Sequence, residues 1–228
     1  MRLPMLALVA TLASTATYAV PTNLVFNGSF EAAFVNPNPN TYHAGFNGNV
    51  PYWGGTGVSY ILSPGQADDG PYFPVYGPFP NHSPDGGNFV EANGETNPGM
   101  TGAIFQGING LTVGQKYVVS FYQAAGQQVG FTGPTTERWL VSLGNETIAS
   151  STISLPQGGV GNWEKQSLIF KATSVSEQLL FLANGAPNGS PPISFLDGVT
   201  IAAVPEPAAM ALLGLGIAGF AIRRRRSF

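Results

Sequence analysis

The sequence predicts an all-β fold, an antiparallel β-sandwich of jelly-roll type, and three observations support this. The chain has 228 residues, of which 30 are Gly, 19 are Pro and only 9% are charged. Short segments of β-branched and aromatic residues alternate with clusters of Gly, Asn, Pro and Ser. Between the two ends of the chain, no window shows a helical period. This pattern is typical of a sandwich or barrel with many turns.

The expected strands succeed one another along the central part of the chain. Their clearest member is Lys116–Ala124, where Tyr117, Val119 and Phe121 alternate with residues of the opposite face. Gly144-Asn145 lies between two strand segments and predicts a hairpin. The number of strands favours two stacked antiparallel sheets. The expected strands are 23–30, 50–53, 58–62, 88–91, 102–108, 116–124, 138–143, 146–153, 163–172, 177–182 and 193–201.

Two long segments are expected to be loops, 36–49 and 63–87. Loops of this length are usually functional or disordered. The aromatic residues of the second loop either pack onto the sandwich, which we favour, or form a binding surface. If they bind, Tyr72 and Tyr76 are the candidates for stacking on a sugar ring, and Asp85 is a candidate for hydrogen bonds to sugar hydroxyls. Trp139 and Trp163 lie in strands and are assigned to the core.

The sequence does not predict an enzyme. Asp68-Asp69 and the pair Glu91 and Glu95 are the acids that resemble a catalytic pair, but neighbours in a Gly/Pro-rich segment lack the fixed separation that glycoside hydrolysis needs. We expect them to be solvated turn acids. The motifs of serine hydrolases, zinc proteases and phosphate-binding loops are absent from the sequence.

The N-terminal residues 1–19 resemble a secretory signal peptide. Arg2 precedes an apolar run, Leu3–Ala13, and small residues allow cleavage by signal peptidase after Ala19. An uncleaved anchor is the alternative, although the run is short for a membrane span. The folded domain is then 20–203.

The charge of this domain and the Cys and His content of the chain exclude several classes of partner and site. It contains 4 cations and 11 acids, so its net charge is 4 − 11 = −7, which argues against nucleic acid as a partner. The chain has no Cys, which excludes disulfides, thiol catalysis and Cys-type zinc sites. The presence of only two His residues argues against a multi-histidine metal site.

The C-terminal segment 204–228 has three chemically distinct parts. Val204-Pro205-Glu206-Pro207 is followed by the uncharged run 208–222 and then by Arg223, Arg224, Arg225 and Arg226. Arginines resist translocation and stay on the cytoplasmic side of a membrane. A run of 15 residues is shorter than the roughly 20 of a comfortable transmembrane helix. We therefore expect a temporary hold in the membrane while a protease acts near the proline motif.

This three-part tail resembles the PEP-CTERM sorting signal of Gram-negative bacteria. The resemblance implies recognition by exosortase, an inner-membrane protease of the transpeptidase type, in cells that produce exopolysaccharide. It also implies that the chain passes transiently through the inner membrane and ends at the cell surface or in the extracellular matrix. Whether the tail is cleaved or retained stays open.

The body resembles galactose-binding-like jelly-roll domains, including carbohydrate-binding modules and DUF642-like proteins. The similarity implies a structural Ca²⁺ held by Glu31 and Asp197, since adjacent first and last strands would bring these carboxylates together beside backbone carbonyls. Family members often have a second acid after the Asp197 position, where this chain has Gly198. The alternative is that both acids accept hydrogen bonds from turn amides. The residues that carry the similarity are 23–31, 50–53, 84–90, 104–122 and 195–199.

These observations predict a non-catalytic, exported protein of the cell surface or extracellular matrix, with polysaccharide as its expected ligand. Two alternatives remain open. One is a purely structural matrix or biofilm component without a specific ligand, and the other is a glycan-active hydrolase.

Overall fold

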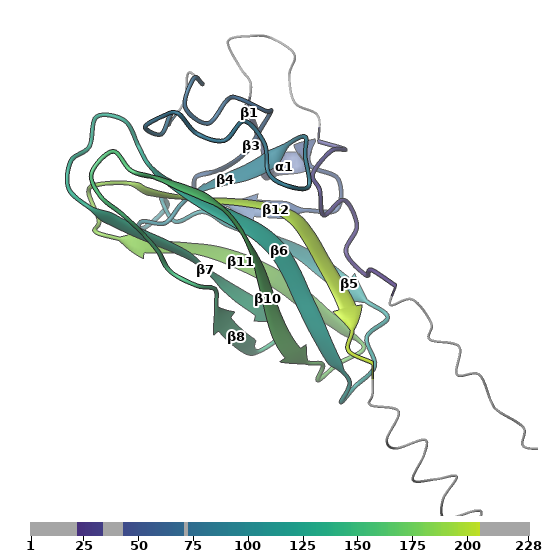
Figure 1. Ribbon diagram of the computed structural model, residues 1–228. Coiled ribbons are helices and arrows are strands. Elements are labelled where there is room, and N and C mark those ends of the chain that lie inside the picture. The colour runs from purple at the N-terminus through teal and green to yellow at the C-terminus, as the bar shows by residue number, and fades with distance from the viewer. Residues whose placement is uncertain (1–21, 34–42, 71–72, 206–228) are drawn as a thin grey trace, which may run out of the picture.

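A computed structural model describes residues 22–33, 43–70 and 73–205 of the chain. The expected signal peptide, Tyr72 and the sorting segment from Glu206 onward lie outside these residues. The described chain forms two stacked antiparallel sheets (Figure 1), which confirms the predicted all-β sandwich. One four-residue helix, α1 (Phe46–Asn49), occurs in this part of the chain. No helix of the described residues is long and apolar enough to cross a membrane.

The two sheets are called sheet A and sheet B. Sheet A has the order β1-β3-β4-β12-β6-β10, and sheet B has the order β2-β5-β11-β7-β8, with β9 paired to β7. From β4 to β7 and from β10 to β12, successive strands alternate between the sheets, as in a jelly roll. The strands of sheet A are β1 (His43–Gly45), β3 (Ser59–Leu62), β4 (Phe89–Asn93), β6 (Lys116–Gln127), β10 (Val160–Lys171) and β12 (Pro192–Ala203). Those of sheet B are β2 (Gly54–Thr56), β5 (Ala103–Asn109), β7 (Thr135–Leu143), β8 (Glu146–Ala149), β9 (Ile153–Leu155) and β11 (Ser176–Ala186).

The core between the sheets follows from the alternation of apolar residues along the strands. In β6, Tyr117, Val119 and Phe121 are buried, as the sequence predicts, whereas the residues between them are partly exposed. In β7 the buried residues include Trp139, whose indole N–H donates to the Phe195 carbonyl of β12, 3.1 Å away. Trp139 therefore joins the two sheets, and its assignment to the core is confirmed.

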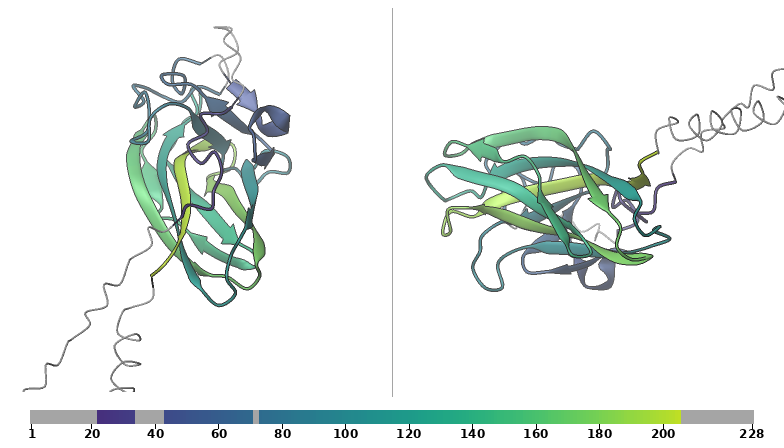
Figure 2. Two further views of the ribbon diagram at one scale, coloured as in Figure 1. Left: turned by 90° about the vertical axis from the view of Figure 1, so that its right-hand side faces the viewer. Right: turned by 90° about the horizontal axis from the view of Figure 1, so that it is seen from below.

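Three predicted segments differ from the structure. Residues 23–30 form no strand, because Asn27 and Phe30 have positive φ angles that break the extended backbone. The segment nevertheless runs beside β12, as both views in Figure 2 show, through the bonds Leu24 N–Ile201 O and Val199 N–Gly28 O. The segment 50–53 turns instead of extending, and the strand there is β2. The predicted loop 36–49 contains β1 and α1.

The long loop 63–87 covers the outer face of sheet A. Phe79 is buried against Phe195 of β12, with ring centroids 4.3 Å apart, and it also contacts Phe89 and Trp163. Together with Val75 and Ala67, these residues form a second apolar cluster outside the main core. The expectation that aromatic residues of this loop pack onto the sandwich is confirmed for Phe79. Trp163 is partly buried in this second cluster rather than in the core between the sheets.

Candidate functional site

Asp197 lies at the centre of an acidic region where β12 meets the loop 63–87. Its side chain is completely buried, and its carboxylate accepts hydrogen bonds from the Ser83 hydroxyl and from the Gly198 N–H at 2.7 Å. Burial raises the pKa of Asp197 to about 8, the like charges of Asp85 and Glu31 add to this rise, and the two hydrogen bonds oppose it. Glu31 and Asp197 therefore interact electrostatically, and their joint role in holding a cation stays a prediction.

The position of Glu31 depends on Gly87. The Glu31 carboxylate accepts a hydrogen bond from the Asn88 N–H at 2.7 Å. A Cβ on Gly87 would overlap this carboxylate. Gly87 also has a φ of 64°, in the left-handed region, so glycine is required here for two reasons. The hydrogen bond between Asn88 and Glu31 fixes the N-terminal segment to the end of the loop 63–87. The same loop contributes Asp85 to the acidic region around Asp197.

The carboxylates of this region suit calcium chemically, although they do not form a cage by themselves. Calcium binds carboxylate and carbonyl oxygens and needs about six to eight of them. Within the described residues, no three His, Cys, Asp or Glu side chains are arranged to hold one ion. A bound cation would relieve the repulsion around the buried Asp197, but it would need backbone oxygens as further ligands.

Of the predicted sugar-binding residues, the structure describes Asp85 and Tyr76, and the two have different neighbours. Asp85 is exposed beside Gly198, whereas the hydroxyl of the half-buried Tyr76 donates to the Phe131 carbonyl at 3.0 Å. The Tyr76 ring faces Gly158, whose ideal Cβ would lie 3.6 Å from it. Tyr76 therefore ties the long loop to neighbouring loops, and its role in sugar stacking stays a prediction. Tyr72 lies outside the described residues.

The expectation that Glu91 and Glu95 are solvated turn acids is wrong. Glu91 is 2% exposed because its strand, β4, is central in sheet A and is covered on both faces. Glu95 follows the strand and is 3% exposed, and its carboxylate accepts hydrogen bonds from the Asn93 side chain and from the Gly189 N–H. Burial raises the pKa of Glu91 well above its usual range, and its Oε1 atom has no hydrogen-bond partner. Asp69 is exposed, and Asp68 accepts a hydrogen bond from the Phe79 N–H at 2.7 Å.

Glu137 of β7 is a further buried acid that sequence reasoning missed. It is 1% exposed, and both carboxyl oxygens lack hydrogen-bond partners. Burial raises its pKa from 4.5 to about 8, against a smaller lowering by the nearby Thr135 hydroxyl. At neutral pH this side chain is mostly protonated, so it carries little charge in the folded protein.

We predict that stability falls as the pH rises from about 4.5 to 8, partly because of Glu137. In this window the folded state binds more protons than the unfolded state, so one such group lowers the unfolding free energy by up to about 1.4 kcal/mol per pH unit. Glu137→Gln cannot ionise and should show a shallower decline and greater stability at pH 8. Urea titrations across this window would measure it. The exposed Glu146→Gln is the control, and equal slopes in wild type and Glu137→Gln would contradict the prediction.

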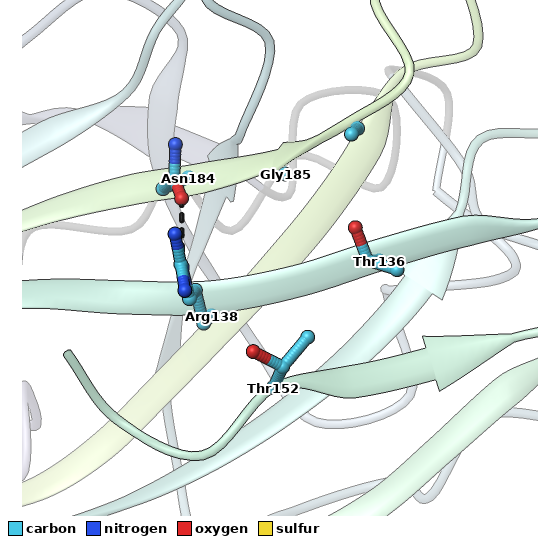
Figure 3. Close-up of a pocket in the computed structure, with 6 residues that line it drawn as sticks. Thr136, Arg138, Thr152, Asn184 and Gly185 are labelled. Carbon is cyan, nitrogen blue, oxygen red and sulfur yellow. Dashed lines mark hydrogen bonds between the residues drawn. The ribbon is translucent and has the colours of Figure 1, made fainter.

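The outer face of sheet B bears a polar pocket, here called the Arg138 pocket, with a volume of about 270 Å³. Arg138 of β7 and Asn184 of β11 are register partners, and the Arg138 Nε–H donates to Asn184 Oδ1 at 2.8 Å (Figure 3). Thr136 and Thr152 extend hydroxyl groups at the same site. The lining residues are Thr136, Arg138, Thr152, Asn184, Gly185 and Ala186.

An apolar strip continues from this pocket along sheet B. Leu140 and Leu182 form the next outward pair on β7 and β11, and Leu180 pairs with Phe105 of β5 one step further. All four side chains are partly exposed. The face therefore combines hydrogen-bonding groups at one end with a semi-exposed apolar surface at the other.

The sequence alone did not point to this pocket. Alternation places Arg138 on the outside of its strand, but Asn184 lies 46 residues later. Only the pairing of β7 with β11 brings the two side chains together.

Comparison with known families identifies the end of the chain. Residues 203–226 match the family model described as the PEP-CTERM protein-sorting motif. The chain carries a PEP-CTERM sorting signal. The motif indicates an exported protein of a Gram-negative bacterium that is sorted by exosortase. A search of curated proteins finds no match to the chain.

Several solved carbohydrate-binding modules are similar to the sandwich in fold. TmCBM61, solved in complex with β-1,4-galactotriose, is 12% identical with a TM-score of 0.41, and the match covers 80% of this chain and 99% of that one. The CBM22-1 xylan-binding domain of Xyn10C from Paenibacillus barcinonensis is also 12% identical, with a TM-score of 0.46 and coverage of 84% and 100%. Similarities at this level do not say which ligand this chain binds.

Proposed function

We propose that this PEP-CTERM protein is a non-catalytic, exported protein whose sandwich binds polysaccharide at the outer face of sheet B. The Arg138 pocket is the observation that carries this proposal. Sugar recognition needs donors and acceptors for hydroxyl groups beside an apolar surface. The donors and acceptors are the side chains of Thr136, Thr152 and Asn184. The apolar surface is the strip formed by Leu140, Leu182, Leu180 and Phe105.

The proposed route to the cell surface uses both ends of the chain. Signal peptidase removes residues 1–19, and the apolar run 208–222 with its four arginines holds the chain briefly in the inner membrane. Exosortase then acts near Val204-Pro205-Glu206-Pro207, and the sandwich reaches the cell surface or the matrix, where exopolysaccharide is the expected partner. The sorting motif at residues 203–226 supports this route.

A polysaccharide-binding screen tests the proposed function. The full chain, purified in mild detergent, should bind selected polymers on a glycan array, and Asn184→Ala should weaken binding because it removes an amide and frees Arg138. Asn162→Ala, at an exposed position of sheet A, is the matched control. A purely structural matrix protein would bind no polymer selectively. Release of sugar products, lost in Glu91→Gln or Asp69→Asn, would instead support the hydrolase.

We also propose a structural Ca²⁺ held by Glu31 and Asp197 together with backbone oxygens. The raised pKa of the buried Asp197 beside two like charges supports it, since a cation would remove that repulsion. When bound, the ion would supply only electrostatic cross-linking between the N-terminal segment and β12.

Calcium should therefore raise the thermal stability of the purified chain. A free ion at about 100 times its dissociation constant adds about 2.7 kcal/mol to the unfolding free energy, which a thermal scan detects as a rise in Tm. Glu31→Gln should reduce the rise, whereas Glu146→Gln should not. A Tm that stays the same with calcium and with chelator would rule out the ion.

A further inference from the structure

Arg138 is the single charged residue among those that line the Arg138 pocket. A guanidinium has five N–H donors and no acceptor. One of the five, Nε–H, donates to Asn184. The two terminal amino groups keep four donors, and within the part of the chain that the structure describes Arg138 makes no other hydrogen bond and no ion pair.

Arg138 lacks a carboxylate partner there although acids outnumber cations in this domain by 11 to 4. The neighbouring acid on β7, Glu137, points into the interior on the opposite face of the sheet. Arg138 is itself half-buried between Asn184 and the residues around it. The guanidinium is thus held in a fixed direction by an uncharged acceptor, which leaves its full positive charge for a ligand.

We propose that the Arg138 pocket binds the carboxylate of an acidic polysaccharide, one that contains uronic acid residues. The planar guanidinium matches a carboxylate in a two-bond geometry. The Thr136 and Thr152 hydroxyls and the Asn184 amide N–H₂ group then contact sugar hydroxyls on either side. This inference rests on the proposed function and names the class of polymer that the site selects.

The selectivity depends on Arg138 alone. The net charge of −7 for residues 20–203 repels a polyanion at long range. At physiological ionic strength this repulsion is screened beyond about 8 Å. A contact that is close to Arg138 is screened much less, so the loss of one side chain should remove the preference for acidic polymers.

The test compares two polymers with the same backbone. Binding of the full chain in mild detergent is measured against polygalacturonate and against the same polymer after methyl esterification, which removes the charge. Wild type should bind the free acid about 10- to 100-fold more tightly, as one charge-assisted pair allows. Arg138→Gln should lose the difference, and Arg138→Lys, which keeps the charge without the planar fork, should retain part of it. Lys165→Gln, an exposed cation on sheet A, should behave as wild type.

The outcomes separate this inference from the proposed function. Equal binding of the acid and the ester, or selectivity that survives in Arg138→Gln, would overturn the inference and leave polysaccharide binding intact. Equally tight binding of dextran sulfate would reveal a general attraction for anions and would also overturn it. Absence of binding to these polymers and to a neutral set of galactan, xylan and dextran would overturn both. Circular dichroism of each variant confirms that it is folded.

Discussion

Trp139→Ala should lower the free energy of unfolding by about 3–5 kcal/mol, the usual cost of deleting a large buried aromatic side chain. Trp139 is completely buried on the inner face of β7 and packs nearly perpendicular to the Phe181 ring, with a centroid distance of 6.0 Å. Its indole N–H also satisfies the Phe195 carbonyl of the opposite sheet. The substitution thus leaves a cavity and an unpaired buried carbonyl in the same place.

Urea denaturation followed by circular dichroism would measure this loss. Trp139→Phe separates the two contributions, because it retains most of the ring volume but removes the hydrogen bond between sheets. The control is Ile169→Ala, at a position of β10 that is 53% exposed. This control should change stability by less than about 0.5 kcal/mol. A loss of similar size in Trp139→Ala and Ile169→Ala would contradict the assigned role of Trp139.

Phe79→Ala should release the loop 63–87 from sheet A and cost about 3 kcal/mol or more. Phe79 is the ring of this loop that contacts Phe195, Phe89 and Trp163 together. The loop also depends on backbone bonds, including Val75 N–Ala67 O and Tyr76 N–Gln127 O, both 2.9 Å. Without Phe79, these bonds would lose the apolar contacts that shield them from water.

Hydrogen exchange would follow the loop and tryptophan fluorescence would follow Trp163. Amides of 63–87 should exchange faster and the emission should shift to longer wavelength, since Trp163 becomes more exposed. Phe26→Ala is the matched control because Phe26 is 61% exposed. Unchanged exchange in the loop of Phe79→Ala would show that backbone hydrogen bonds alone hold it.

The fold could be predicted well because strand composition and turn residues are local signals. Alternation along Lys116–Ala124 indicated the correct inner face of β6, and Gly144-Asn145 indicated the β7–β8 hairpin. The strand predicted at 23–30 was wrong because its apolar residues resemble a strand, whereas Asn27 and Phe30 have positive φ angles and form local turns through the bonds Phe30 N–Asn27 O and Ala33 N–Phe30 O. Apolar composition alone does not distinguish a strand from a segment with such turns.

For the candidate sites, too, local sequence signals were informative and the burial and pairing of distant residues were not predicted. The N-terminal segment runs beside β12, so the Glu31 charge influences Asp197, whereas the joint cation site of these two residues stays a prediction. Glu91 and Glu95 were misjudged because acids next to Gly and Pro look solvated. The burial of Glu91 depends on the elements that cover β4, and Glu95 contacts Gly189, 94 residues later in the chain. The Arg138 pocket was missed entirely, because a lone arginine in a strand has no distinctive local pattern.

The sequence by itself determined the all-β class, which side chains of the clearest strand point into the core, and the sorting signal at the C-terminus. Each of these depends on neighbouring residues, through side-chain alternation, turn chemistry or a contiguous motif. Tertiary structure decided that loop 63–87 covers sheet A, that Glu137 is buried, and that Arg138 meets Asn184 on the open face of sheet B. These depend on the pairing of strands that are far apart in the chain, which only the packed fold fixes.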